Sequence, residues 1–371
     1  MHIKNIFKNR IFFFKFKETH GVTALHYACM NDDYESVAFI LNHIDTNVNA
    51  KALSLAIEYD FGRKVYRNVY PIHMACHFGS NILFDRIKVQ EGIKIHVQDD
   101  CDRSILHYSL KNCKYDVYRQ VLKFDNFNCK QDKCGYDGYP IHIVCQINNL
   151  KGCQFLLSQP MIQLDDPVDD KRNEDDYGKT PILIASSRGY SEIVKAILDH
   201  GLVDFNYRLQ KTGETTLLNL CFYGLDDALN VLMKKKGFSM RNQKYKDDST
   251  PLILATNAQS LRSVQLLLEY GEYQINACEK VLKRTALMLA CKKGCPDIVE
   301  VLLRVPGIDY NKKDISGMTA LHFACRKADT RCVELLLQMP DIDVNATANI
   351  FFIIFFFNYF LFFDFFLTNF F

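Results

Sequence analysis

A seven-residue pattern of the form Thr-Pro-Leu-His-x-Ala-Cys recurs along this chain at a nearly constant spacing. The two copies closest to that form begin at Thr23 and Thr319. The other copies begin at Tyr70, Ser104, Tyr139, Thr180, Thr215, Thr250 and Thr285, so successive starts lie 47, 34, 35, 41, 35, 35, 35 and 34 residues apart. Such a period is typical of one supersecondary unit stacked along an axis, and not of a globule around a single core. The pattern therefore predicts an extended binding surface.

The copy at Thr319 shows what one unit is expected to form. Gly317 is a turn residue, and Thr319 is placed to cap a first helix by accepting a hydrogen bond from its first turn. Apolar residues then recur at helical spacing, first at Leu321, Ala324 and Cys325 and again, after a break, at Val333, Leu336 and Leu337. Each unit is therefore predicted to be helix, turn, helix and a hairpin-like loop. Such short helices are not stable alone, so stacking supplies the stability.

The motif and its period resemble those of the ankyrin repeat family. The resemblance covers residues 18–347, with about nine repeats, and implies an all-α solenoid of stacked helix-turn-helix-hairpin units. It also implies a non-catalytic module that binds protein partners without a cofactor. The fold hosts many functions, so the resemblance does not identify the partner.

Histidine stands at the fourth motif position in five copies, as His26, His73, His107, His142 and His322. Five similarly placed imidazoles raise the question of metal or proton chemistry. The resemblance implies instead that each ring bonds the motif Thr and neighbouring loop backbone, and this is the interpretation we favour. Leu183, Leu218, Ile253 and Met288 replace histidine in the four copies between, so no metal-ligand set is expected.

Six of the 14 cysteines occupy the same place in their repeats, on the first helix. They are Cys29, Cys76, Cys145, Cys221, Cys291 and Cys325. Because buried free cysteine commonly serves as a small apolar residue, we expect reduced core residues and a cytoplasmic or nuclear protein.

Two of the intervals are long and predict insertions, which in solenoids form surface loops. The first spans about residues 47–67, and the second spans residues 165–176 and is rich in aspartate. The second has the charge to attract Ca²⁺, but Pro167 stands where an EF-hand has a ligand and no Gly stands at the turn position. A solvated acidic loop is the expectation.

One set of residues has the composition of a zinc site: Cys129, Cys134, His142 and Cys145. Its spacing fits no common zinc knuckle, and two of the four already belong to the repeat pattern, so no metal is expected. No nucleophile elbow and no Gly-rich phosphate loop occur in the sequence.

The ends of the chain differ from the repeats. Residues 1–17 are basic and Phe-rich, and residues 348–371 contain 12 Phe in the last 21 positions, where a tenth motif should stand. Such a composition favours a misread or truncated gene model, because T-rich non-coding sequence translates into Phe. The alternative is a hydrophobic anchor over residues 351–371, which is long enough to cross a membrane.

In ankyrin repeats the partner usually meets the concave side, which includes the exposed end of the first helix. By that resemblance, positions seven and eight after each motif start are the candidate partner-binding residues. Those of interest are His77, Phe78, Arg188, Phe222, Tyr223, Lys292, Lys293, Arg326 and Lys327, and Lys111, Asn112 and Ser187 occupy the same positions. The last four cations lie on adjacent repeats, with the aromatic pair two repeats earlier. An acidic peptide carrying an apolar residue is the expected partner, and a solvated basic face is the alternative.

A net charge of +2 predicts no general attraction to nucleic acid. The leading hypothesis is therefore a protein-interaction scaffold in the cytoplasm or nucleus. Two alternatives stay open: a fragment of a larger protein whose catalytic or channel domain is missing, and a membrane adaptor held by the Phe-rich tail.

Overall fold

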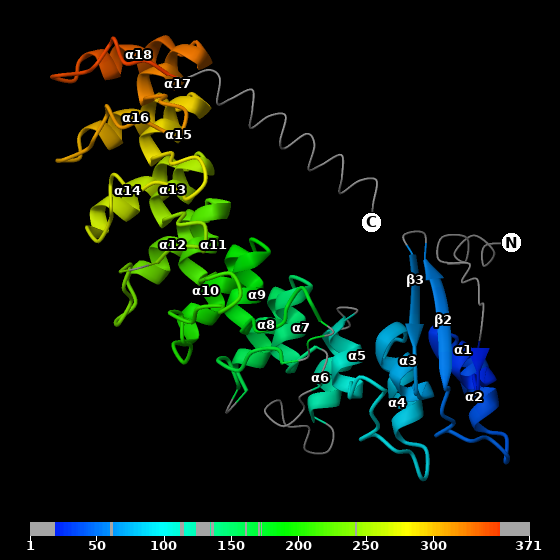
Figure 1. Cartoon of the computed structure of the whole chain (residues 1–371). Coiled ribbons are helices and arrows are strands. Elements are labelled where there is room, and N and C mark those ends of the chain that lie inside the picture. The colour runs from blue at the N-terminus through cyan, green and yellow to red at the C-terminus, as the bar shows by residue number, and fades with distance from the viewer. Residues whose placement is uncertain are drawn as a thin grey trace, which may run out of the picture. The chain divides into compact units, whose positions relative to one another are not determined.

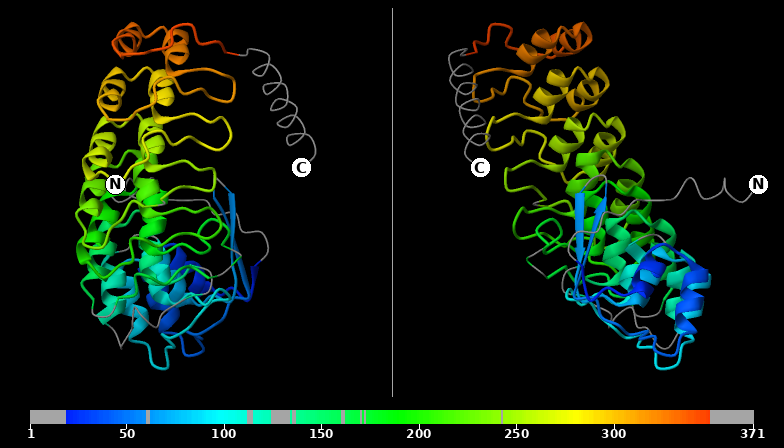
Figure 2. Two further views of the ribbon diagram at one scale, coloured as in Figure 1. Left: turned by 60° about the vertical axis from the view of Figure 1, so that its left-hand side comes forward. Right: turned by 90° about the vertical axis from the view of Figure 1, so that its right-hand side faces the viewer.

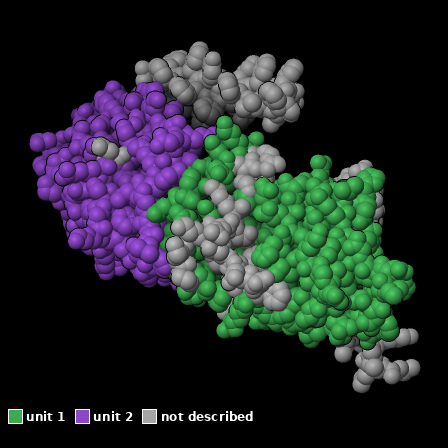
Figure 3. Space-filling model, turned by 90° about the horizontal axis from the view of Figure 1, so that it is seen from below, with its two compact units in different colours: residues 1–184 green, residues 185–371 purple. Residues whose placement is uncertain are grey.

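The computed structural model describes residues 19–348, apart from 60–61, 112–114, 124–133, 135–136, 160–161, 170, 172 and 242. The described chain divides into two compact units, residues 1–184 and 185–371 (Figure 3). The expectations for residues 1–17 and for 349–371 concern segments outside the described residues. None of the helices in the described ranges combines the length and the hydropathy needed to cross a membrane.

Unit 1 consists of short helices in pairs and a small sheet (Figure 1). The helices are α1 (Ala24–Met30), α2 (Tyr34–Leu41), α3 (Pro71–Phe78), α4 (Asn81–Lys88), α5 (Ile105–Lys111), α6 (Tyr115–Lys123), α7 (Pro140–Gln146) and α8 (Leu150–Leu157). The odd-numbered helices pack on one another in chain order, and α2, α4 and α6 form a second row. Helix α9 (Pro181–Ser187) begins in unit 1 and ends in unit 2.

Unit 2 repeats the same arrangement. Its helices are α10 (Ser191–His200), α11 (Thr216–Tyr223), α12 (Asp226–Met233), α13 (Pro251–Asn257), α14 (Leu261–Tyr270), α15 (Ala286–Lys293), α16 (Pro296–Leu303), α17 (Ala320–Lys327) and α18 (Thr330–Leu337). One row of consecutively packed helices consists of α11, α13, α15 and α17, and a second row consists of α10, α12, α14, α16 and α18. The connecting loops project to one side of these rows (Figure 2). The predicted all-α solenoid of stacked helix pairs is confirmed.

Each first helix begins one residue after a motif start. In three of the four copies with an apolar fourth position, those at Thr215, Thr250 and Thr285, the Thr hydroxyl accepts directly from the backbone N–H three residues on. Thr215 Oγ1 accepts from Leu218 N at 3.3 Å, and Thr285 Oγ1 accepts from Met288 N at the same distance. The hydroxyl thus satisfies one of the backbone donors that a helix start leaves open.

In four of the copies with histidine at the fourth position, the ring joins two repeats, whereas His322 bonds Thr319 of its own repeat. The Thr23 N–H donates to His26 Nδ1 at 3.2 Å, so Nε2 carries the proton and donates to the carbonyl of Val69 at 3.2 Å. The same geometry recurs at His73, whose Nε2 bonds the carbonyl of Val97 at 3.1 Å. The Nε2 atoms of His107 and His142 likewise bond the carbonyls of Gly138 and Asp166. The structural role expected for these histidines is confirmed.

The first insertion is more ordered than expected. It forms a hairpin of β2 (Ser54–Tyr59) and β3 (Gly62–Tyr66), with β1 (Thr19–His20) pairing on the other side of β2. Leu55 and Tyr66 are cross-strand partners and both are buried, so the base of the hairpin packs into unit 1. The prediction of a simple surface loop is wrong here, because cross-strand pairs of apolar side chains stabilise a hairpin.

The acidic insertion also departs from its expectation in part. Asp176 is buried, and its Oδ2 accepts from Gln146 Nε2 at 3.0 Å, while Asp166 Oδ2 accepts from the Tyr139 hydroxyl at 3.0 Å. The insertion thus folds back onto α7, and the prediction of a fully solvated acidic loop is wrong for Asp176. Carboxylates can be buried when polar side chains supply hydrogen bonds in place of water.

Five of the six equivalent cysteines are buried, but Cys325 is exposed. Helix α15 is covered by α17, whereas among the described helices none follows to cover α17 in the same way. The expectation of a core residue is therefore wrong for Cys325.

Native-state alkylation should distinguish these positions. We expect iodoacetamide to modify Cys325 within minutes and Cys221 at least about a hundredfold more slowly, because a buried thiol reacts only when its region opens. Burial also raises the pKa of the Cys221 thiol. Peptide mass mapping measures both rates, and labelling in urea is the control for intrinsic reactivity. Equal native-state rates for the two thiols would contradict the packing described here.

Candidate partner-binding surface

The ends of the first helices in unit 2 form a continuous row, which we term the helix-end surface. It consists of Phe222 and Tyr223 on α11, Asn257 and Ala258 at the end of α13, Lys292 and Lys293 on α15, and Arg326 and Lys327 on α17. These helices pack consecutively, so equivalent positions lie beside one another. The structure therefore places both the predicted aromatic pair and the predicted cations on one row, with the repeat of α13 between them.

The aromatic pair is exposed but held in place. Phe222 and Tyr223 are 48% and 45% exposed, and their rings meet edge to face with centroids 5.0 Å apart. The Tyr223 hydroxyl donates to the carbonyl of Ser187 at 2.8 Å. Arg188, the residue after Ser187, is half-buried. An aromatic ring that is already fixed loses little entropy on binding, as an anchor residue requires.

The basic part of the surface has a strong local positive field. Lys292 is half-buried, whereas Arg326 and Lys327 are exposed. Burial lowers the pKa of Lys292, and Arg284, Arg326 and Lys293 lower it further by repulsion. Among the described residues, no carboxylate lies within ion-pair distance of Lys292, Lys293, Arg326 or Lys327. These four cations are thus available to a partner.

Arg284 joins this cluster and was not among the candidates from sequence. Its guanidinium carbon lies 5.3 Å from the centroid of the Phe323 ring, and Arg326 lies 5.2 Å from the same ring. Arg284 Nε is 3.6 Å from Asp314 Oδ2. The residue stands immediately before the motif start at Thr285, a position that the pattern assigns to the loop. Arg284 joins the cluster because α17 packs on α15 and brings Phe323 and Arg326 next to it.

The candidates in unit 1 do not form such a surface. His77 is only 7% exposed, because Tyr66 of β3 covers it; its Nδ1 lies 3.2 Å from the carbonyl of Tyr108. His77 is therefore not available to a partner, which corrects its prediction as a surface residue. Phe78 is half-buried, with its ring against that of His77. Lys111 is engaged with Asp137, and Asn112 lies outside the described residues.

Unit 1 instead contains a buried network of charges. Asp137 Oδ2 lies 2.5 Å from Arg103 Nε and 2.6 Å from Lys111 Nζ, and all three side chains are mostly buried. Burial alone raises the pKa of Asp137, but Lys111 and Arg103 outweigh it, and the pKa is lowered. Asp99 lies 3.5 Å from Arg103 and accepts from the Tyr108 hydroxyl at 2.7 Å. This network links successive repeats and has no signature in the motif.

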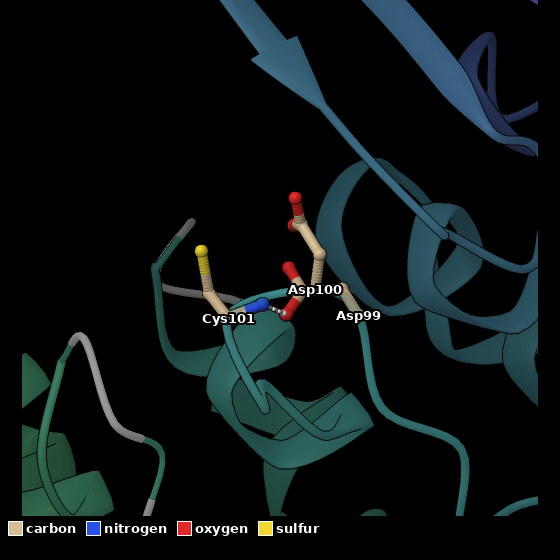
Figure 4. Close-up of side chains that lie close together, drawn as sticks. All are labelled: Asp99, Asp100 and Cys101. Carbon is tan, nitrogen blue, oxygen red and sulfur yellow. Dashed lines mark hydrogen bonds between the residues drawn. The ribbon is translucent and has the colours of Figure 1, made fainter.

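Asp99, Asp100 and Cys101 bring three ligand-type atoms close together (Figure 4). Asp99 Oδ1 accepts from the backbone N–H groups of Cys101 and Arg103, both at 2.9 Å. Its other oxygen, Oδ2, accepts a hydrogen bond from the Tyr108 hydroxyl. Because the only buried carboxylate of the three is already bonded on both oxygens, the group is a turn stabilised by hydrogen bonds.

The residues considered for zinc are also engaged. Both ring nitrogens of His142 are used, by Tyr139 N–H and by the carbonyl of Asp166. Cys134 is buried and accepts from the backbone of Asp137 at 3.0 Å. Cys129 lies outside the described residues. His142 and Cys134 therefore make hydrogen bonds that stabilise the fold.

A cavity of about 460 Å³ lies in unit 2 between the loops that follow α12 and α14. Its lining includes Glu272, whose carboxylate accepts from Ser239 Oγ, Met240 N and Arg241 Nε. The carboxylate therefore holds two neighbouring loops together.

The chain is similar to several known proteins. It is 24% identical over 213 residues to the human transient receptor potential cation channel subfamily A member 1, a match that covers 55% of this chain and 18% of that protein. It is 29% identical over 253 residues to the probable 26S proteasome regulatory subunit p28 of Saccharomyces cerevisiae, covering 67% of this chain and 90% of that one. The chain thus spans less than a fifth of the length of the first relative.

A crystal structure of an ankyrin repeat protein, EF0377, has 27% identity and a TM-score of 0.46, and it covers 54% of this chain and 97% of that chain. Family models match more widely. The model for three copies of the ankyrin repeat matches residues 141–244 and 217–314, and the single-repeat model matches residues 20–53 and 316–349. These matches cover more than half of the sequence, and the chain belongs to the ankyrin repeat family.

Proposed function

We propose that this array is a non-catalytic protein-interaction scaffold that binds acidic segments of partner proteins through its helix-end surface. The observation that carries the proposal is the set of four cations without an ion-pair partner among the described residues, on the same row as an exposed aromatic pair and separated from it by the repeat of α13. Electrostatic complementarity would guide an acidic segment to this row, and an apolar side chain would be held by Phe222 and Tyr223. Ankyrin repeats are generally non-catalytic, which agrees with this assignment.

Reversing two charges tests the proposal. We expect the double variant Lys293→Glu, Lys327→Glu to bind a fluorescein-labelled Glu-Glu-Phe-Glu-Glu peptide at least tenfold more weakly than the wild type, a loss of about 1.4 kcal/mol. Fluorescence anisotropy at low salt measures the affinity, and added salt should reduce the difference because exposed charges are screened.

The matched control is the double variant Lys234→Glu, Lys236→Glu, which makes the same change in net charge on exposed lysines after α12. If both double variants bind the peptide alike, the attraction is not local to the helix-end surface and the assignment fails. Phe222→Ala tests the aromatic part separately and should weaken only the peptide that contains Phe.

A second candidate is that the array is the interaction segment of a longer multidomain protein. The match to the cation channel, of which this chain spans 18%, supports it. A full-length transcript that encodes a further domain in frame would favour this candidate, and a stop codon directly after the array would exclude it. A cytoplasmic or nuclear location remains part of the proposal, supported by the free, buried thiols of Cys29, Cys76, Cys221 and Cys291.

A further inference from the structure

We propose that Arg284, Lys292 and Arg326 form a receptor for a phosphorylated side chain of a peptide bound along the helix-end surface. The inference rests on the proposed function, since the peptide is the one that the surface would hold. The inference specifies the anion that would bind, and it includes Arg284, which is not part of the helix-end surface.

The geometry brings two arginines to one aromatic ring. The guanidinium carbons of Arg284 and Arg326 lie 5.3 Å and 5.2 Å from the centroid of the Phe323 ring, which is itself buried. An aromatic ring attracts a guanidinium and fixes its plane. Two like charges at one ring repel each other, so an anion between them would relieve that repulsion.

Arg284 lies beside a buried carboxylate at more than hydrogen-bond distance, and its Nε has no hydrogen-bond partner among the described residues. Asp314, 3.6 Å away, is a buried turn residue whose other oxygen accepts from the backbone of Ser316 at 2.9 Å and of Met318 at 3.0 Å. The Arg284 side chain is 16% exposed, so it retains a face toward solvent. A buried donor without a partner costs free energy, and an acceptor on a ligand would relieve that cost.

The charge balance favours a dianion over a single carboxylate. Four cations gather here, namely Arg284, Lys292, Lys293 and Arg326. Among the described residues, Asp314 is the one carboxylate within ion-pair distance of any of them, so three of the four have no ion-pair partner there. Burial raises the pKa of Glu279, and the repulsion among the cations contributes to the lowered pKa of Lys292. A phosphomonoester carries a charge of about −2 at neutral pH and presents three acceptor oxygens.

The chemistry of the donors also fits phosphate. Two planar guanidiniums offer paired N–H groups that match phosphate oxygens, and Lys292, which is close enough for both arginines to lower its pKa, adds a compact ammonium. Arg326 makes no ion pair among the described residues, and its Nη1 faces only the sulfur of Met318 at 3.8 Å. Its donors are thus open to a ligand.

Three labelled peptides test the inference: Glu-Glu-Phe-Glu-Glu extended by phosphoserine, by glutamate or by serine. We expect the wild-type chain to bind the phosphoserine peptide at least tenfold more tightly than the glutamate peptide, and inorganic phosphate to compete with it. Lys292→Gln and Arg326→Gln should reduce that ratio to near one. Arg326→Lys should give an intermediate ratio, because the charge remains and the planar fork is lost. Circular dichroism melts show whether each variant is folded, and Lys236→Gln is the matched control.

The outcomes separate this inference from the proposed function. If the phosphoserine and glutamate peptides bind equally, or if the ratio survives in Lys292→Gln, the phosphate receptor is wrong and the acidic surface stands. If none of the three peptides binds, both proposals fail. Sedimentation with vesicles containing phosphatidylinositol bisphosphate is a further arm. Binding there that depends on Lys292, without binding of the phosphopeptide, would overturn the inference in favour of a membrane headgroup.

Discussion

The variant Asp137→Asn is expected to lower the free energy of unfolding by about 3 to 5 kcal/mol. Asp137 is the common partner of Arg103 at 2.5 Å and of Lys111 at 2.6 Å, and all three side chains are less than a fifth exposed. Loss of the carboxylate leaves two buried cations side by side, with Asp99 3.5 Å from Arg103. An uncompensated charge inside a protein costs far more than a surface pair contributes. Urea unfolding of the full chain, followed by circular dichroism, measures the change.

Two further variants show whether the loss comes from unpaired charge. Asp100→Asn changes an exposed carboxylate in the same loop and should alter stability by less than about 0.5 kcal/mol. The double variant Lys111→Met, Asp137→Asn should lose less free energy of unfolding than the two single variants lose together, because one of the two unpaired buried cations is removed. A small loss for Asp137→Asn, similar to that of Asp100→Asn, would contradict the network.

Acidification from pH 6.5 toward pH 4 is expected to destabilise unit 1, through its buried motif histidines. Burial lowers the pKa of His26 and of His73 from 6.5 to about 4, although a backbone carbonyl partner opposes the effect at each ring. Below pH 6.5 the unfolded chain binds protons that these folded rings do not accept, so stability falls as the pH falls. The full contribution is present above pH 6.5 and is lost by about pH 4. It amounts to about 3 kcal/mol for each ring.

Urea unfolding at pH 7.0, 6.0 and 5.0 measures this dependence in a range where most carboxylates stay ionised. His73→Leu, which copies the residue at Leu183 and Leu218, should have a shallower pH dependence than the wild type, even if it is less stable. His43→Gln is the control, because His43 lies in an exposed loop. A pH dependence that is unchanged in His73→Leu would mean that other groups cause the acid sensitivity.

The helices were largely predictable because their signals are local. A capping residue such as Thr215 or Thr285, followed by apolar residues at helical spacing, specifies where a short helix begins. The role of His26 was also predictable by resemblance, and its bonds to Thr23 and Val69 confirm it. Repetition strengthened each of these signals, since the same position recurs in register along the chain.

The candidate site was predictable only in part. Phe222, Tyr223 and the cations on α15 and α17 were found from their position after the motif, and the structure places them on one row. His77 holds the same motif position but is covered by Tyr66. The difference arises from the hairpin inserted next to it, whose packing depends on contacts between residues distant in sequence. Whether the row binds a partner remains a prediction.

The sequence alone determined the repeat unit, the start of each helix and the family, because these depend on spacing and on residues a few positions apart. The tertiary structure decided which side chains meet across repeats. It placed Arg284 and Arg326 on the ring of Phe323, joined Asp137 to Arg103 and Lys111, and left Cys325 exposed. Stacking sets those contacts, and the energy of a buried charge or ring depends on its neighbours in space and not on its place in a motif.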